Sequence, residues 1–400
     1  MTLVMSVPSI DRPGRAALAL SLLLLAGACA TPTRDGWAAY DAGDYEAALA
    51  AWRPLAEQGD ADAQFLLGTM FDEGRGVPLD RAQAARWYEL AAEQGYAQAQ
   101  SNLALLYYTG NGVETSHAQA MRWNRLAAEH GYARAQTNLG VMHMFGQAVP
   151  RDPGAAREWF ERAAAQGDAQ AQRLLGSMYR EGVGVARNDV EAVRWFTLAA
   201  EQGVASAQYE LGMLRLRGKD VPHDDALAME WLRRAADQSL PEAQYVVAWM
   251  HLEGRGVDPD RATAAMWIGR AAAQDHPGAQ TALGLMYLEG DGVAQDDASA
   301  ARWLRRAAAH GDATAQYNLG LLHLQGRGVA RDPEQAKSWL ARAAEQGSAA
   351  ARARLDVVAA QRPVLARDEE PGRARTSTPP ARVADETRVR RGGGVATPPR

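Results

Sequence analysis

The stretch ALGLMYLEGDGV, residues 282–293, ends in a glycine-rich turn. A turn of this kind can cradle a phosphate when it follows a strand. The same pattern recurs, for example as FLLGTMFDEGRGV at residues 65–77, and each copy lies between two predicted helices. Gly292 is replaced by Ala148 and Asp220 in two copies. The stretch therefore indicates a repeated structural turn and not a phosphate site.

The motif repeats with a period of 36 residues. Tryptophan recurs at positions 87, 123, 159, 195, 231, 267, 303 and 339, and glycine at positions 74, 110, 146, 182, 218, 254, 290 and 326. A fixed period of roughly 20–50 residues is the signature of stacked repeats. One helix pair cannot bury its own apolar face, so we expect neighbouring pairs to stack with the repeat tryptophans buried between them.

Each repeat predicts two helices. The spacing of Ala63, Leu67 and Met70 predicts a first helix over residues 61–73. The second helix is expected to bury Ala84, Trp87, Tyr88, Ala91 and Ala92 and to end at Gly95. Its N-cap is predicted to be a short polar side chain in every repeat. These N-cap residues are Asp80, Ser116, Asp152, Asn188, Asp224, Asp260, Asp296 and Asp332.

The pattern A-x-x-x-L-G-x-x-Y-x-x-G-x-G-V, followed by D-x-x-x-A-x-x-W-x-x-x-A-A-x-x-G, resembles the Sel1-like repeat, a relative of the tetratricopeptide repeat. The resemblance covers eight units over residues 61–347 and implies an all-α, right-handed superhelical solenoid of helix-turn-helix repeats. Residues 36–60 resemble a tetratricopeptide-type hairpin, and residues 348–361 are expected to form a capping helix. In this family the first helices line the concave side of the superhelix.

The first helices carry an unusual face opposite their core stripe. In the last four repeats this face is apolar and aromatic, where a solvated face would be polar. It holds Tyr209, Met213, Leu216, Tyr245, Trp249, Leu252, Leu285, Leu288, Tyr317, Leu321 and Leu324, together with Thr281. One interpretation is a groove that binds a protein or peptide partner. The other is packing against the first helix of the next repeat, and the sequence favours neither clearly.

The N-terminus reads as an export signal. Residues 16–26 form an apolar run that is too short to span a bilayer and is followed by small residues. The segment LAGAC, ending at Cys29, resembles the lipobox of bacterial lipoproteins. This resemblance implies cleavage after residue 28, acylation of Cys29, a linker over residues 29–35 and an outer-membrane location facing the periplasm. The alternatives are an ordinary signal cleavage near Ala28, giving a soluble periplasmic or secreted protein, and a start at Met5.

Residues 362–400 differ from the repeats in composition. They contain nine arginines and five acidic residues with little to bury, so we expect this tail to be disordered. It could contact the acidic remainder of the chain or anionic polymers, but a solvated tail without a partner is the simpler interpretation.

The sequence offers no catalytic, metal or cofactor motif. His143, His251 and His323 occupy the aromatic position of three first helices, where packing explains them. The chain has one cysteine and a net charge of −5, which argue against a cysteine-based zinc site and a nucleic-acid partner. We therefore predict a non-catalytic scaffold or adaptor of the bacterial cell envelope. A secreted, host-directed interaction protein and an enzyme acting on envelope material are the alternatives.

Overall fold

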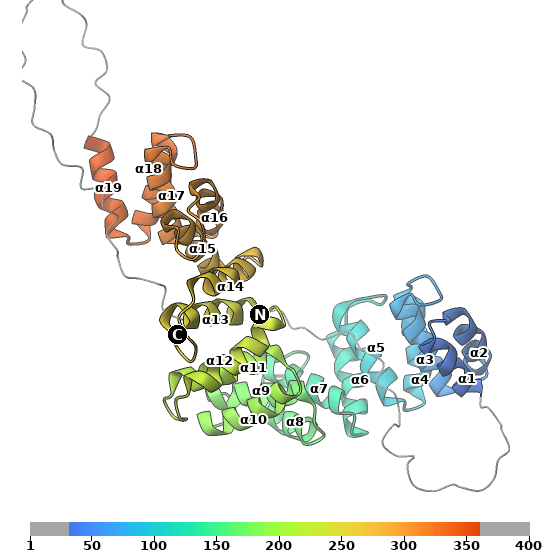
Figure 1. Cartoon of the computed structure of the whole chain (residues 1–400). Helices are drawn as coiled ribbons and strands as arrows, with labels where there is room; N and C mark the ends of the chain where they lie inside the picture. Colours follow the sequence, from blue (N-terminus) through green and yellow to red (C-terminus); the bar gives the residue numbers. More distant parts are fainter. Residues whose placement is uncertain (1–31, 361–400) are drawn as a thin grey trace, which may run out of the picture. The chain divides into compact units, whose positions relative to one another are not determined.

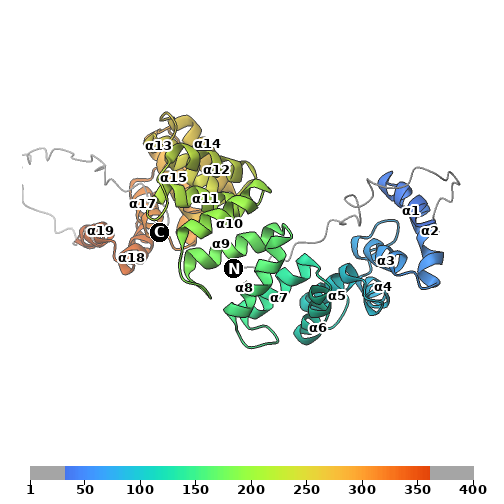
Figure 2. The same ribbon diagram turned by 90° about the horizontal axis from the view of Figure 1, so that it is seen from below.

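A computed structural model describes residues 32–360, which form 19 α-helices and no strand (Figure 1). The predicted signal peptide, Cys29 and the tail over residues 362–400 lie outside the described residues. The described residues divide into two compact units between Val204 and Ala205. Unit 1 contains α1–α10, and unit 2 contains α11–α19. Figures 1 and 2 show that helices follow one another in antiparallel pairs within each unit.

The helix bounds repeat with the 36-residue period. The first helices are α3 (Ala61–Glu73), α5 (Ala97–Thr109), α7 (Ala133–Phe145), α9 (Ala169–Glu181), α11 (Ala205–Arg217), α13 (Pro241–Glu253), α15 (Pro277–Glu289) and α17 (Ala313–Gln325). The second helices are α4 (Arg81–Glu93), α6 (His117–Glu129), α8 (Pro153–Ala165), α10 (Asp189–Glu201), α12 (Asp225–Asp237), α14 (Arg261–Ala273), α16 (Asp297–Ala309) and α18 (Pro333–Glu345). The prediction of an all-α solenoid of helix pairs is confirmed.

Local signals set these bounds. All eight predicted N-caps accept a backbone N–H of the first turn of their second helix, as Asp80 does from Gln83 over 3.0 Å. The first helices end at a left-handed residue such as Gly74, with φ of +68°, which only glycine adopts without strain. Ser239 and Asp275 adopt φ of +67° and +62° where the other repeats have glycine after the second helix.

A glycine in most first helices lets the second helix approach closely. A Cβ on Gly176 would lie 2.7 Å from the ring of Phe196, and a Cβ on Gly212 would lie 2.6 Å from Leu232. The residue that meets this glycine is fully buried, as Tyr88, Phe160, Phe196, Leu232, Leu304 and Leu340 are. In the two repeats with alanine instead of glycine, at positions 104 and 248, the facing position holds Asn124 or Ile268. First and second helices are therefore fitted to each other within each repeat.

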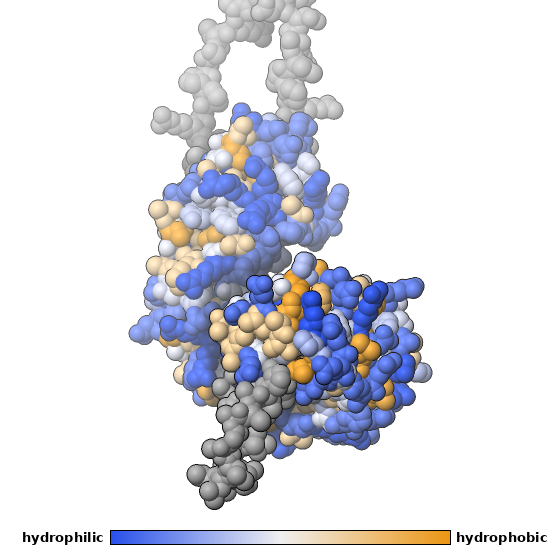
Figure 3. All heavy atoms as spheres, turned by 90° about the vertical axis from the view of Figure 1, so that its right-hand side faces the viewer, coloured by the Kyte–Doolittle hydropathy of each residue, from blue (hydrophilic) through white to orange (hydrophobic). Residues whose placement is uncertain are grey.

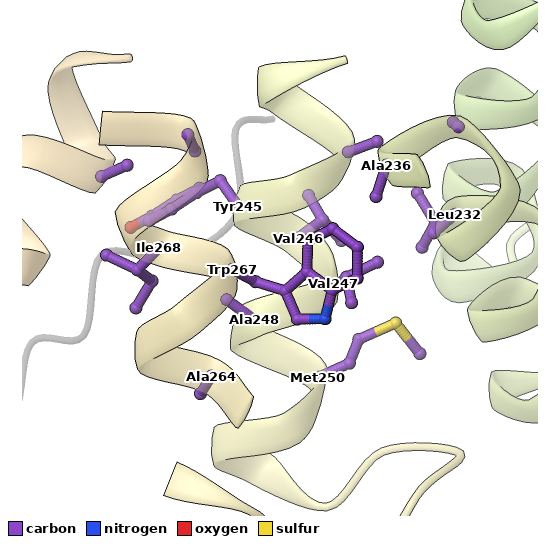
Figure 4. Packing of buried hydrophobic residues seen from close by; sticks show 14 of the residues in the cluster. Leu232, Ala236, Tyr245, Val246, Val247, Ala248, Met250, Ala264, Trp267 and Ile268 are labelled. Atoms are coloured by element: carbon purple, nitrogen blue, oxygen red, sulfur yellow. The ribbon is translucent and has the colours of Figure 1, made fainter. Parts of the chain in front are cut away.

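The repeat tryptophans are less buried than the sequence predicts. Trp123, Trp231 and Trp267 are buried, but the other five are half-buried. The reason is that the residue just after each tryptophan takes the fully buried position, while an arginine guanidinium covers seven of the eight indole rings at 4.5–5.4 Å. Figure 4 shows Trp267 in the core of unit 2 with Val246, Val247 and Ile268.

A second periodic contact, which sequence reasoning missed, joins glutamines along the stack. Every first helix has a buried glutamine near its start, and in seven of the eight it donates to a carbonyl at the end of the preceding second helix, as Gln64 Nε2 does to Ala56 O over 3.1 Å. In six repeats its Oε1 accepts from a glutamine 30 residues later, at the end of its own second helix. These pairs, at 2.8–2.9 Å, are Gln94–Gln64, Gln166–Gln136, Gln202–Gln172, Gln238–Gln208, Gln274–Gln244 and Gln346–Gln316. We call this set the glutamine ladder.

The ladder is interrupted in two repeats. Histidines, His130 and His310, replace the second glutamine there. In the same two repeats, Gln100 Oε1 and Gln280 Oε1 are buried without a hydrogen-bond partner. Because an unsatisfied buried oxygen costs stability, these repeats contain a defect that the others lack.

Both ends of the stack are closed differently from the repeats. At the start, α1 (Pro32–Asp41) and α2 (Tyr45–Glu57) form a hairpin in which Trp52 is fully buried. Helix α1 begins inside the segment predicted to be a linker. At the other end, α19 (Ala349–Ala360) lies in the segment predicted to be a capping helix. There Asp356 stands where the repeats have glycine or alanine, so its side chain occupies the space that a following second helix needs.

Candidate partner-binding surface

The apolar face predicted for the first helices of unit 2 is only partly accessible. Met213, Leu216, Tyr245 and Thr281 are buried, with 4%, 8%, 7% and 8% of their surface exposed. The first three pack into the core of unit 2, so packing between helices accounts for them. The remaining eight residues of the prediction are half-buried: Tyr209, Trp249, Leu252, Leu285, Leu288, Tyr317, Leu321 and Leu324. We call these eight residues the groove residues.

A contact to the next repeat explains why Tyr245 is buried. Its ring stacks on His276, which precedes α15, with ring centroids 4.8 Å apart. Burial raises the pKa of the Tyr245 hydroxyl and lowers the pKa of His276, so both side chains are neutral near pH 7. In unit 1 the equivalent residue Phe65 lies 5.0 Å from Tyr96 in the same way. Tyr245 therefore packs against the next repeat and is not available to a partner.

Trp249 is the largest groove residue, and a charged cluster borders it. The guanidinium of Arg255 lies over the indole ring, 5.1 Å from its centroid. Both oxygens of Asp225, at the start of α12, accept from Arg255, at 2.6 and 3.1 Å. His223 Nε2 lies 3.2 Å from the same carboxylate. A bidentate pair of this kind fixes the guanidinium, so Trp249 is held in place from one side.

The pKa of Asp225 is lowered, first by its hydrogen bond from Arg255 and then by the charges of Arg255 and His223. The carboxylate is therefore ionised at neutral pH, and the cluster combines one indole with a fixed ion pair that has no net charge. An arrangement of this kind suits an aromatic or apolar side chain of a peptide that packs on the indole.

The equivalent face of unit 1 has another character. Thr69, Ser101 and Thr137 are buried at these positions, and Thr137 donates to Asp168 Oδ1 over 3.0 Å. Arg173, Ser177 and Arg180 are the half-buried residues of α9 on this face. Leu105, Tyr108 and Met144 are also half-buried at these positions, so the face of unit 1 mixes polar, charged and apolar side chains.

The histidines that the sequence singled out lie apart, in α7, α13 and α17. Burial lowers the pKa of His143. His323 is buried, and Nδ1 of both His251 and His323 has no hydrogen-bond partner. Within residues 32–360, no three histidine, cysteine or acidic side chains gather as metal ligands would. None of the helices in this part of the chain is long and apolar enough to cross a bilayer.

Comparisons with known proteins agree with the repeat geometry. The family model described as Sel1 repeat matches eight consecutive segments, at residues 61–96, 97–132, 133–168, 169–204, 205–240, 241–276, 277–312 and 313–348. A search of curated proteins found no match. Among solved structures, a Sel1 repeat protein from Oxalobacter formigenes is 36% identical, with a TM-score of 0.58, over 78% of this chain and 90% of its own.

A second solved structure is that of c5321, a protective antigen of uropathogenic Escherichia coli strains that displays an SLR fold. It is 34% identical over 82% of this chain and 79% of its own, with a TM-score of 0.45.

Proposed function

The chain belongs to the Sel1 repeat family, whose members are in general protein-interaction scaffolds, and we propose that it binds a protein or peptide through the groove residues of unit 2. The observation that carries this proposal is the half-burial of eight apolar and aromatic side chains on one face of α11, α13, α15 and α17. Half-buried aromatic side chains contribute strongly to binding when a partner completes their burial. The proposed role is that of a scaffold without catalytic activity.

Apolar residues elsewhere on the surface of the described chain do not form a comparable continuous face. Most of the surface visible in Figure 3 is hydrophilic, and its apolar residues appear as small separate patches. Exposed large hydrophobic residues elsewhere in the described chain are scattered, for example Leu79, Val190 and Met266. The groove residues instead follow one another from repeat to repeat.

Site-specific photo-cross-linking tests the proposal. A photoreactive amino acid replaces Leu285 or Leu321 in the groove, and a control replaces the exposed Ala298 on the second helix α16. We expect discrete cross-linked products from the two groove positions and none from the control. Cross-links from Ala298 alone would contradict the proposal.

The substitution Trp249→Ala provides the quantitative test. Loss of a central aromatic residue should weaken binding of the captured partner by about 2 kcal/mol or more. If the indole serves only packing, the same variant should instead unfold at a lower temperature and still bind. Titration calorimetry and thermal melting of one preparation separate these outcomes.

We also propose that the protein is exported and held at the outer membrane by a lipid on Cys29. The support is the apolar run over residues 16–26 and the LAGAC segment, in which the chain's single cysteine stands. Metabolic labelling with a fatty acid should mark the wild-type protein and leave Cys29→Ala unlabelled. Stable membrane association of the unlabelled variant would contradict the anchor and favour a different envelope location.

A further inference from the structure

The outer surface of unit 2 carries a row of fixed arginines. Arg234, Arg270, Arg306 and Arg342 occupy the same position in α12, α14, α16 and α18, three residues after the repeat tryptophan. Each guanidinium lies over the indole of its own helix, at 4.5, 4.5, 5.0 and 4.8 Å from the ring centroid. Because the repeats stack, the row places one exposed positive charge on each successive repeat.

Two further arginines widen this row in its middle. Arg302 and Arg305 are exposed on α16, and together with the four stacked arginines they form what we call the basic face. Helix α14 contains no acidic residue, and the one acidic residue of α16, Asp297, is paired with Arg327. Within the basic face, Arg306 is paired with Asp275 and Arg234 with Glu230.

The middle of the basic face thus has an excess of positive charge. Stacking on an indole holds a guanidinium in place while its N–H groups stay available, and their fork matches a carboxylate. A partner for this face should therefore present several carboxylates on a firm surface.

The chain itself carries such a surface at its other end. The first hairpin and the start of α3 expose seven carboxylates, with Arg53 as the single basic residue between the first and the last of them. The seven are Asp35, Asp41, Asp44, Glu46, Glu57, Asp60 and Asp62. Glu46 and Glu57 stand eleven residues apart on α2, close to three helical turns, and therefore share one face of that helix. We call this segment the acidic hairpin.

We propose that the basic face of one molecule binds the acidic hairpin of a second copy of this chain. The two surfaces differ, so the contact is heterologous, and each bound molecule leaves one further surface of each kind free to extend a chain of copies. The contact lies on second helices and on the first hairpin, so it leaves the groove residues of α11–α17 accessible. It is therefore independent of the proposed partner binding.

The expected association is weak and depends on salt. Exposed ion pairs individually contribute little, and ionic screening shortens their reach to about 3 Å at 1 M salt. Sedimentation velocity of the full chain should show a mean sedimentation coefficient that rises with protein concentration at low salt. At about 1 M salt this rise should disappear.

Charge reversal identifies the surfaces. Arg270→Glu with Arg305→Glu should abolish the rise, whereas the control Arg86→Glu with Arg125→Glu changes the net charge equally on second helices of unit 1 and should retain it. Glu46→Arg with Glu57→Arg should also abolish the rise. Each variant keeps one of the two wild-type surfaces. A mixture of the two variants should therefore associate, although neither variant associates by itself.

Several outcomes would overturn the proposal. One is a wild-type chain whose sedimentation does not change with concentration at low salt. Another is association that survives Arg270→Glu with Arg305→Glu in a variant that melts like the wild type. A third is binding of phosphatidylglycerol vesicles through these arginines while the chain stays monomeric, which would identify the basic face as a membrane contact instead.

Discussion

In unit 1 the residue three positions after the repeat tryptophan is leucine in three second helices, Leu90, Leu126 and Leu198, whereas in unit 2 it is arginine in all four. Unit 1 places the covering arginine just before the tryptophan in two of these helices, as Arg194 does over Trp195 at 5.4 Å. Most indoles are covered in both units, but the outer surface that results is partly apolar in unit 1 and basic in unit 2. The arginine that covers the repeat tryptophan can therefore stand before or after it in the helix, and the choice decides whether the outer surface is apolar or basic.

The turns show a similar difference between the units. In unit 2 the residue after the first helix's terminal glycine pairs with the first residue of the preceding second helix: Arg255 with Asp225, Asp291 with Arg261 and Arg327 with Asp297. The charges are reversed in the middle pair. The equivalent positions of repeats two to four in unit 1 hold Asn111 and Arg81, Gln147 and His117, and Val183 and Pro153, none of which is a pair of opposite charges.

The largest expected effect concerns the core that both units share. Phe196→Ala in unit 1 and Leu232→Ala in unit 2 each leave a cavity against a first-helix glycine and should each destabilise the fold by about 2–5 kcal/mol. Trp195→Ala should cost less than Phe196→Ala, because Trp195 is half-buried and Phe196 is fully buried. Urea denaturation measures all three. A larger effect for Trp195→Ala would contradict the assignment of the core.

The next effect concerns the glutamine ladder, which is interrupted once in each unit. His130→Gln and His310→Gln supply the missing donor to Gln100 Oε1 and Gln280 Oε1, so each should stabilise the fold by about 0.5–1.5 kcal/mol. The reverse change, Gln346→His, should destabilise unit 2 because it removes the donor to Gln316. Thermal melts of the three variants test this, and destabilisation by both histidine replacements would show that the ladder geometry does not extend to these repeats.

The smallest effect concerns the ion pairs that join successive repeats at the turns of unit 2. Asp225→Asn should lower stability at pH 7 by about 0.2–1 kcal/mol, because the pair is partly exposed. The folded-state pKa of Asp225 lies below its unfolded value, so this stabilisation is complete above the unfolded value of about 4 and is lost as the pH falls through the folded value. The difference between variant and wild type should therefore vanish in acid. A difference that stays constant across this range would exclude the carboxylate charge as its source.

The helices could be predicted from the sequence because their signals are local and repeated eight times. The first helix predicted over residues 61–73 is α3 with the same bounds, and all eight N-caps were identified. The accessibility of the apolar face could not be predicted, since it depends on contacts between repeats. Nothing on α13 itself distinguishes Tyr245, buried by His276, from the half-buried Trp249 four residues later.

The glutamine ladder was within reach of the sequence, because Gln64 and Gln94 recur with the period of the tryptophans. It was missed because a polar residue near a helix end is ordinarily assigned to solvent. No such signal shows that Phe196 is fully buried and Trp195 only half-buried, since both residues are large and apolar and are neighbours in the sequence. Only the approach of α10 to Gly176 determines which of them fills the core.

The fit between glycine and its facing residue also limits how the gene can change length. Loss of one whole repeat, residues 97–132, keeps every first helix with its own second helix. Loss of residues 105–140 removes the same length but breaks two first helices and joins their halves. Ala104 then stands in the place of Gly140, facing Phe160 of the second helix. A Cβ at Gly140 would lie 2.5 Å from the Phe160 ring, so the alanine does not fit there. Recombination between repeats should therefore yield folded descendants when its breakpoints fall between repeats. Breakpoints inside a repeat join halves that were not selected together.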